Sequence, residues 1–123
     1  MENIQILTTY KIQNTITPVI KFNQKIYRNK THNKHNNRTY IKNTVFVPKP
    51  IYKYFKEPKQ LYLIPVNNNC FEISIYEQKD NNLSYKTVLN KNNRFVIPKK
   101  LVNDKLYCSF VYVPLFDKFY LLL

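Results

Sequence analysis

The sequence predicts a mostly β fold with two short helices, and three features of the composition lead to this expectation. The chain contains no alanine, which is the best helix former, and no glycine. It is rich in Ile, Val, Thr, Tyr and Phe, whose branched or aromatic side chains suit the half-buried surface of a strand. Asparagine clusters separate the apolar runs and tolerate the positive φ of tight hairpin turns. With 123 residues the chain can bury one modest core, so we expect one compact domain.

The expected strands are short apolar runs bounded by asparagine or proline. They comprise residues 15–22, 25–28, 39–47, 60–66, 71–76, 83–89, 94–97, 106–113 and 118–123. The asparagine clusters at 67–69, 81–82 and 92–93 are expected to turn the chain between strands.

Two short helices are expected, each opened by a proline. Residues 49–56 follow Pro48, and residues 99–104 follow Pro98. Proline suits the first turn of a helix because the N–H that it lacks would have no partner there. Pro58 is expected to end the first helix.

Residues 28–42 form a polar, basic segment in which only Tyr40 and Ile41 are apolar. Such a composition predicts a long basic loop or arm rather than a core element. Two interpretations stay open at this point. The segment is either a solvated linker whose lysines reflect an AT-rich genome, or an arm that lies on phosphates.

The chain is strongly basic, with 20 Lys and Arg against seven acids, a net charge of +13 and a pI near 9.8. Residues 1–60 carry +10 and residues 61–123 carry +3. A/T-rich codons explain why lysine outnumbers arginine, but they do not explain the shortage of acids. A basic protein of this kind repels itself unless it meets a polyanion, so a nucleic-acid partner is expected.

The sequence also contains an internal repeat. Residues 45–51 match 95–101 in hydrophobic pattern with an identical Pro-Lys pair, at an offset of 50. Two further matches follow at offsets of 49 and 48, between 63–66 and 112–115 and between 71–75 and 119–123. We therefore expect two copies of a strand, helix, strand, strand unit, at 39–76 and 84–123. Residues 1–38 would supply N-terminal strands and the start of the basic arm.

The segment 93–102, Asn-Arg-Phe-Val-Ile-Pro-Lys-Lys-Leu-Val, resembles the AbrB/SpoVT/MazE/MraZ-type swapped-hairpin DNA-binding domains. Their signature is Gly-Arg, two or three apolar residues, proline and a short helix. The resemblance covers about residues 84–123 and, more weakly, 39–76, so the chain looks like a tandem MraZ-type arrangement. Asn93 replaces the family's glycine, and Thr44 stands where the first copy should have arginine.

This resemblance implies tandem units that form an interlocked hairpin barrel, a pseudo-dimer within one chain. It also implies DNA contacts near the first strand of each unit. By position, these are Arg94, Lys86 and Lys91 in the second copy and Lys42 in the first.

The candidate nucleic-acid-binding residues are basic side chains from two segments. The basic segment and its flanks contribute Lys25, Arg28, Lys30, Lys34, Arg38 and Lys42, and the second hairpin contributes Lys86, Lys91 and Arg94. Tyr27 and Tyr40 flank or lie within the basic segment and are candidates for stacking on bases.

No catalytic or cofactor motif is present in the sequence. Phosphate loops need glycine, which is absent, and the seven acids are scattered. His32 and His35 lack nearby cysteine or acidic partners, so no metal site is expected. Cys70 and Cys108 fit buried structural thiols. We therefore expect a protein that is not an enzyme and needs no cofactor or metal.

Three functions stay open. The first is a DNA-binding protein, such as an AbrB-like transcription regulator, an antitoxin-like regulator or an architectural factor. The second is a ribosomal or ribonucleoprotein component that binds structured RNA, and the third is a viral protein-interaction module. The sequence contains no signal-peptide pattern and no apolar run long enough for a bilayer, so we expect an intracellular protein with no membrane partner, in the cytoplasm or nucleoid. An organelle or a virus-infected cell is the alternative location, and a homo-oligomer is an alternative state of assembly.

Overall fold

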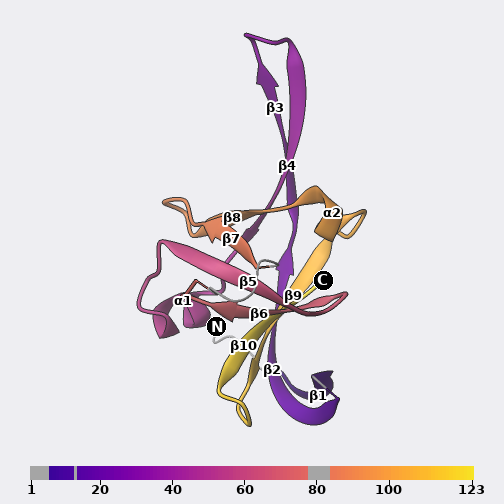
Figure 1. The fold of residues 1–123 in the computed structure, drawn as a ribbon, viewed down its shortest axis with the longest axis vertical. Coiled ribbons are helices and arrows are strands. Elements are labelled where there is room, and N and C mark those ends of the chain that lie inside the picture. The colour runs from indigo at the N-terminus through magenta and orange to yellow at the C-terminus, as the bar shows by residue number, and fades with distance from the viewer. Residues whose placement is uncertain (1–5, 13, 78–83) are drawn as a thin grey trace.

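Two antiparallel sheets and two short helices make up the fold (Figure 1). The computed structural model describes residues 6–12, 14–77 and 84–123. The mostly β prediction is confirmed, because strands make up more than half of the described residues. The interlocked hairpin barrel is not confirmed, because no closed barrel is present among the described residues. No helix in these ranges has the length and apolar character required to cross a membrane.

The larger sheet has seven strands in the order β1-β2-β9-β10-β6-β5-β7. They are β1 (Ile6–Ile12), β2 (Thr15–Lys25), β9 (Tyr107–Val113), β10 (Lys118–Leu122), β6 (Cys70–Ser74), β5 (Gln60–Asn67) and β7 (Tyr85–Val88). Strand β1 was not among the expected strands. The start of the expected strand 83–89 and the expected turn at 81–82 lie outside the described residues.

The smaller sheet has three strands in the order β3-β4-β8. They are β3 (Tyr27–Asn33), β4 (Arg38–Phe46) and β8 (Arg94–Ile97). The expected strand at 25–28 is therefore wrong. Lys25 ends β2 in one sheet, and Tyr27 begins β3 in the other.

The helices α1 (Lys49–Tyr54) and α2 (Lys99–Val102) each begin directly after a proline, as expected. Pro48 and Pro98 are the N-caps and share almost the same backbone angles, with φ and ψ of −56° and 138° in one and −55° and 137° in the other. Both helices are shorter than predicted, since residues with positive φ follow them. These residues are Lys56 and Glu57 after α1 and Asn103 after α2.

Asparagine takes the place of glycine at several turns. Positive φ occurs at Asn14 (66°), Asn37 (53°) and Asn93 (62°). The β-hairpin turns therefore reach the left-handed region without glycine, as the sequence predicts for Asn93. The turn at 67–69 differs, because none of its asparagines has a positive φ.

The main core lies between the two sheets and is supplied almost equally by the two matched segments. The first segment contributes Val45, Val47, Ile51, Leu61, Leu63, Phe71 and Ile73, and the second contributes Phe95, Ile97, Val102, Cys108, Phe110, Phe119 and Leu121. Ile26 completes the buried set. The element order is also the same in both segments, namely β4-α1-β5-β6 and β8-α2-β9-β10.

The strand registers pair equivalent positions of the two segments. In the ladder between β4 and β8, Val45 lies opposite Phe95, which is its own counterpart at the offset of 50. In the ladder between β6 and β10, Glu72 lies opposite Tyr120, its counterpart at the offset of 48. Each ladder is therefore arranged symmetrically about one central pair.

A second cluster of buried side chains lies on the other face of the larger sheet, under the β1–β2 hairpin. Ile12 and Val19 of this hairpin pack with Val111, Val113 and Tyr120. Strand β2 serves both parts, because residues Thr15–Val19 pair with β1 alone whereas Ile20–Lys25 pair with β9. The second half of β2 is therefore a strand of the sheet beside β9, whereas its first half, paired with β1, covers one face of that sheet.

Candidate nucleic-acid interface

The basic segment 28–42 is a β-hairpin, which we call the arm. Strands β3 and β4 pair antiparallel from Tyr27 opposite Thr44 to Asn33 opposite Arg38, and the hairpin stands clear of the rest of the molecule (Figure 1). The segment is therefore an arm built of two paired strands and not an irregular loop. Both faces of the arm meet solvent, so its strands need no apolar side chains and lack the alternation by which a strand is recognised.

Asparagine side chains fix the turn at the tip of the arm. The Oδ1 atom of Asn33 accepts a hydrogen bond from the backbone N–H of His35 at 2.9 Å. The Oδ1 atom of Asn36 accepts one from the N–H of Arg38 at 3.1 Å, and its Nδ2 donates to the hydroxyl of Tyr40 at 2.8 Å. The exposed end of the hairpin is thus ordered by its own side chains.

The register divides the side chains of the smaller sheet into two faces, because successive strand residues point to opposite sides. One face packs on the core through Val45, Phe95 and Ile97. The opposite face, which we call the outer face, carries Tyr27, Asn29, Arg38, Tyr40, Lys42, Phe46, Arg94 and Val96. Along this face of β4, Arg38, Tyr40 and Lys42 are followed by the buried Thr44 and then by Phe46.

Four side chains converge on the outer face where the arm joins the body, a cluster that we call the foot. The Arg94 guanidinium carbon lies 4.2 Å from the ring centroid of Phe46 and 4.9 Å from that of Tyr27. The Lys25 Nζ atom lies 5.3 Å from the same Tyr27 centroid. The two rings meet edge to face at 5.8 Å. Tyr27 is thus already engaged by two cations, whereas Tyr40 is 42% exposed.

Arg28 has an intramolecular partner. Its Nη2 donates a hydrogen bond of 3.0 Å to the backbone carbonyl of Asn103, the residue that caps the C-terminus of α2. A cation is favourable at this end of a helix, where carbonyl groups lack partners within the helix. Arg28 therefore attaches the arm to the body.

The remaining predicted cations lie at three places. Lys30 is exposed on the face opposite the outer face, next to Ile41 across the hairpin. Lys34 is exposed in the turn at the tip. Lys86 is exposed on β7, and Lys91 is exposed in the turn before β8. The structure thus gathers Lys25, Arg38, Lys42 and Arg94 on or beside the outer face and leaves the others apart from it.

One aromatic residue beside the foot was missed by the sequence analysis. Tyr107 lies opposite Lys25 in the ladder between β2 and β9 and is 66% exposed. The run 106–113 is apolar on both faces, a pattern that favours burial of its aromatic residues. Only the pairing of β2 with β9 brings it next to the arm, and no local pattern in the sequence predicts that pairing.

The strands around the foot contain no acidic residue. Strands β2, β3, β4 and β8 include neither Asp nor Glu. The ion pair found among the described residues joins Lys118 of β10 to Glu72 of β6, away from the foot. The positive charge of the arm and foot is therefore not neutralised by carboxylates from the described residues.

The histidines and cysteines have ordinary structural surroundings. His32 Nδ1 lies 3.4 Å from Thr39 Oγ1 across the arm. Among the described residues, no group of three or more His, Cys, Asp or Glu side chains comes together as a metal site would require. Cys70 and Cys108 are free and buried, as expected, and burial raises the pKa of these thiols to about 11 and about 12.

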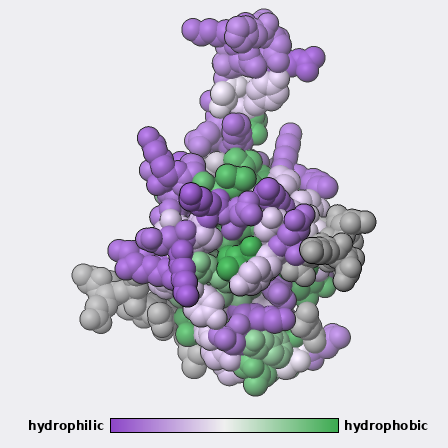
Figure 2. All heavy atoms as spheres, turned by 60° about the vertical axis from the view of Figure 1, so that its left-hand side comes forward, coloured by the Kyte–Doolittle hydropathy of each residue, from purple (hydrophilic) through white to green (hydrophobic). Residues whose placement is uncertain are grey.

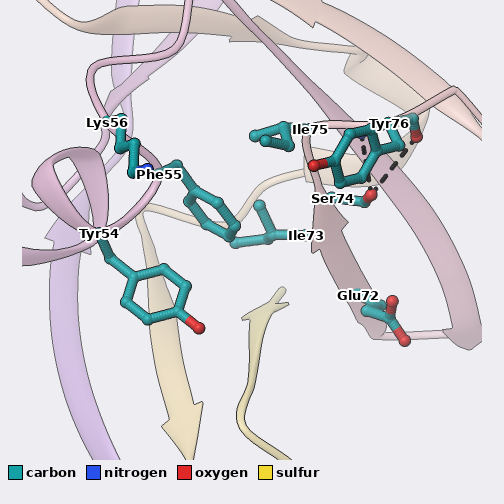
Figure 3. A pocket seen from close by; sticks show the side chains of 8 residues that line it. All are labelled: Tyr54, Phe55, Lys56, Glu72, Ile73, Ser74, Ile75 and Tyr76. Carbon is teal, nitrogen blue, oxygen red and sulfur yellow. Dashed lines mark hydrogen bonds between the residues drawn. The ribbon is translucent and has the colours of Figure 1, made fainter.

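A pocket of about 410 Å³ lies on the body, between the end of α1 and strand β6. Tyr54 and Phe55 reach in from the helix end and face Ile73 (Figure 3). The lining also includes both Lys56 and Glu72, so it has no excess of one charge. This pocket lacks the features of a polyanion site.

A hydrogen-bonded cluster near this pocket joins α1 to the turn between β9 and β10. The hydroxyls of Tyr54 and Tyr112 both donate to Oδ1 of Asp117, at 3.2 and 2.6 Å. The pKa of Tyr112 is raised, first by this hydrogen bond and then by desolvation. The cluster therefore has a structural explanation, because it holds the helix against the hairpin.

Comparison of the chain with family models, curated proteins and solved structures gives no match. The candidate interface therefore rests on the geometry and charge of this molecule.

Proposed function

We propose that this protein is a nucleic-acid-binding protein that is not an enzyme, and that its preferred partner is duplex DNA. One observation carries the proposal. The arm is an ordered two-stranded ribbon with five basic residues and no acid, and it stands clear of the body (Figures 1 and 2). A projecting ribbon of one charge sign has little use in folding, whereas it suits a polyanion.

The shape of the arm favours DNA over double-stranded RNA. The major groove of B-form DNA is wide enough to admit a two-stranded β-ribbon. The major groove of A-form RNA is deep and too narrow for side chains to read. An arm inserted in the DNA groove would place its cations between two phosphate backbones.

The symmetric ladders support a regulatory or architectural role built on tandem hairpin units. Val45 opposite Phe95 and Glu72 opposite Tyr120 are the pairs expected if two copies of one unit were related by a twofold axis. We propose that the chain is such a pseudo-dimer, in the manner of the swapped-hairpin DNA-binding domains that it resembles. The nucleoid or cytoplasm would be the site of action.

Structured RNA is a second candidate partner, favoured by one observation. Tyr40 is 42% exposed and Ile41 is 50% exposed, both near the tip of the arm. Exposed rings next to cations suit unpaired bases in loops and bulges, because every base has a face on which a ring can stack.

A salt titration tests the proposal. If about six cations contact phosphates, the binding constant for a 20-base-pair duplex should fall with salt at a log–log slope of about −5. Neutralising Lys30, Lys34 and Arg38 with glutamine should flatten the slope by about 2.7. A matched control neutralises Lys53, Lys56 and Lys59, which are exposed on α1 and the following loop, and should change the slope much less.

The outcomes separate the candidates. Weak duplex binding together with tight binding of a structured RNA hairpin would replace DNA by RNA. Equal slopes for the arm variant and the control variant would show that the arm is not the contact surface, and the proposed function would then be wrong.

A further inference from the structure

We infer that the foot of the arm is a phosphate-binding subsite, in which Arg94 and Lys25, both held over the ring of Tyr27, supply the positive charge for one phosphate group. The inference rests on the proposed function and deepens it, because it assigns a ligand class to the foot. The foot lies about eight residues from the tip along β4, which at about 3.3 Å per residue is a distance of about 25 Å.

The foot concentrates positive charge. Two cations from strands far apart in sequence lie 4.9 and 5.3 Å from the ring centroid of Tyr27. Neither has a carboxylate partner among the described residues. By these distances the two cations are at most about 10 Å apart, and like charges at that distance repel each other by about 0.4 kcal/mol in water and by more when partly buried. A bound anion would turn this repulsion into attraction.

The guanidinium of Arg94 is held in place although one of its hydrogen-bond donors has no partner. Its Nε atom is buried and has no hydrogen-bond partner in the described part of the chain. The rings of Phe46 and Tyr27 hold the guanidinium plane in one orientation. A planar guanidinium that is fixed in advance presents its terminal N–H groups to the oxygens of a phosphate better than a flexible lysine does.

The foot lies on the same face of the smaller sheet as Arg38, Tyr40 and Lys42. A nucleic acid that contacts the tip on this face therefore continues toward the foot. A side chain stacked at the base of the arm is placed to bind a backbone phosphate and not to read a base at the floor of a groove.

The ligand chemistry is a phosphate oxyanion, which either a nucleic-acid backbone or free inorganic phosphate can supply. Nuclear magnetic resonance distinguishes them, because the chain has three arginines and hence three side-chain Nε–H signals. Loss of one signal in Arg94→Lys assigns it. We expect this signal to shift when a 20-base-pair duplex is added. A shift with millimolar inorganic phosphate alone would also support the subsite and identify it as a general anion site.

A binding measurement completes the test. Lys25→Gln should reduce the magnitude of the duplex salt slope by about 0.9, and Lys53→Gln, an equal charge change on α1, should leave it nearly unchanged. If the duplex binds through the arm while the Arg94 signal stays still and Lys25→Gln matches the control, the subsite is wrong and the proposed function stands. If no duplex or RNA binds, the proposed function fails, and the response of Arg94 to inorganic phosphate alone decides the subsite.

Discussion

At the residue scale, Arg94 shows how one side chain can connect two parts of a protein. It belongs to β8 in the second matched segment, yet its guanidinium lies on Phe46 of the first segment and on Tyr27 of the preceding strand β3. Stacking of this kind contributes about 0.5 to 2 kcal/mol, depending on how far the cation is desolvated. Lysine keeps the charge but not the planar group, so the two residues are not interchangeable here.

A double-mutant cycle measures this contact. Arg94→Lys and Tyr27→Leu should each lower the free energy of unfolding by about 1 kcal/mol, with a coupling energy of at least about 0.5 kcal/mol in urea denaturation. Lys42→Gln, on the same face but outside the foot, is the control and should show no coupling to Tyr27→Leu. Strict additivity of the first pair would contradict the stacking.

The buried thiols predict how stability depends on pH. Burial raises the pKa of Cys70 to about 11 and of Cys108 to about 12, above the ordinary value for an unfolded chain. The unfolded state therefore releases these protons first as the pH rises. The stability contributed by the neutral thiols is complete below about pH 8.5 and is lost as the pH rises toward 11.

Chemical denaturation at a series of pH values checks this. Between pH 9 and 11 the free energy of unfolding of the wild type should fall more steeply than that of the Cys70→Ala, Cys108→Ala double variant, by about 1 to 2 kcal/mol per pH unit. Lysine and tyrosine titrate in both proteins, so the difference isolates the thiols. Parallel curves would mean that the thiols are accessible in the folded protein.

At the element scale, strands with one buried face were predicted more accurately than strands exposed on both faces. Strand β8 was predicted with its observed bounds, because the apolar Phe95 and Ile97, both buried, alternate with the half-buried Arg94 and the exposed Val96, and Pro98 follows the strand. Strand β3 was interpreted as loop because neither of its faces is buried along the arm. Its position as a strand depends on pairing with β4, which no hydrophobic pattern in residues 28–33 predicts.

The tip of the arm offers a test of how order in this element affects binding. Asn37 has a φ of 53°, which asparagine and glycine tolerate and a β-branched residue does not. Asn37→Val should loosen the tip, speed amide exchange in residues 30–41 and weaken duplex binding several-fold. Because the arm stands clear of the core, the melting temperature should change little.

Asn37→Gly is the matched control for this substitution. Glycine adopts the same φ without strain, so exchange and affinity should stay close to those of the wild type. If Asn37→Val binds duplex as tightly as Asn37→Gly does, then order at the tip is not needed for binding.

At the scale of the whole molecule, the chain enters the two matched segments differently, and the difference is the arm. Within the second segment the N–H of Leu89 donates to the carbonyl of Lys59, and ahead of the first segment the N–H of Ile26 donates to the carbonyl of Leu106. Ile26 and Leu89 both pack on the main core. Four residues separate Leu89 from Arg94, whereas 17 residues separate Ile26 from Thr44. The arm therefore occupies the position at which the other segment has a short turn.

Only part of the correspondence between the two matched segments could be predicted from the sequence. The repeat of 45–51 in 95–101 was detected, because buried strands followed by Pro-Lys leave a clear pattern. The equivalence of Ile26 and Leu89 was not, since it depends on backbone hydrogen bonds to strands in the opposite segment. The foot, which joins β2, β3, β4 and β8, was hidden for the same reason.

The second segment supplies the design of an armless protein. Replacing residues 27–43 by Asn-Lys-Asn-Asn, the sequence of residues 90–93, should close the first segment with a turn already present in the fold. The main core keeps all its residues, because none of them lies in 27–43. We therefore expect cooperative unfolding in urea, with a free energy of unfolding within about 2 kcal/mol of the wild type. Part of that loss is the stacking of Arg94 on Tyr27, which is removed with the arm.

Duplex binding by the armless protein should fall at least tenfold. The salt slope should flatten by the equivalent of about four phosphate contacts, because five cations are removed and one lysine is added. A folded armless protein with unchanged binding would move the interface elsewhere, and a chain that cannot fold without residues 27–43 would contradict the equivalence of the two segments.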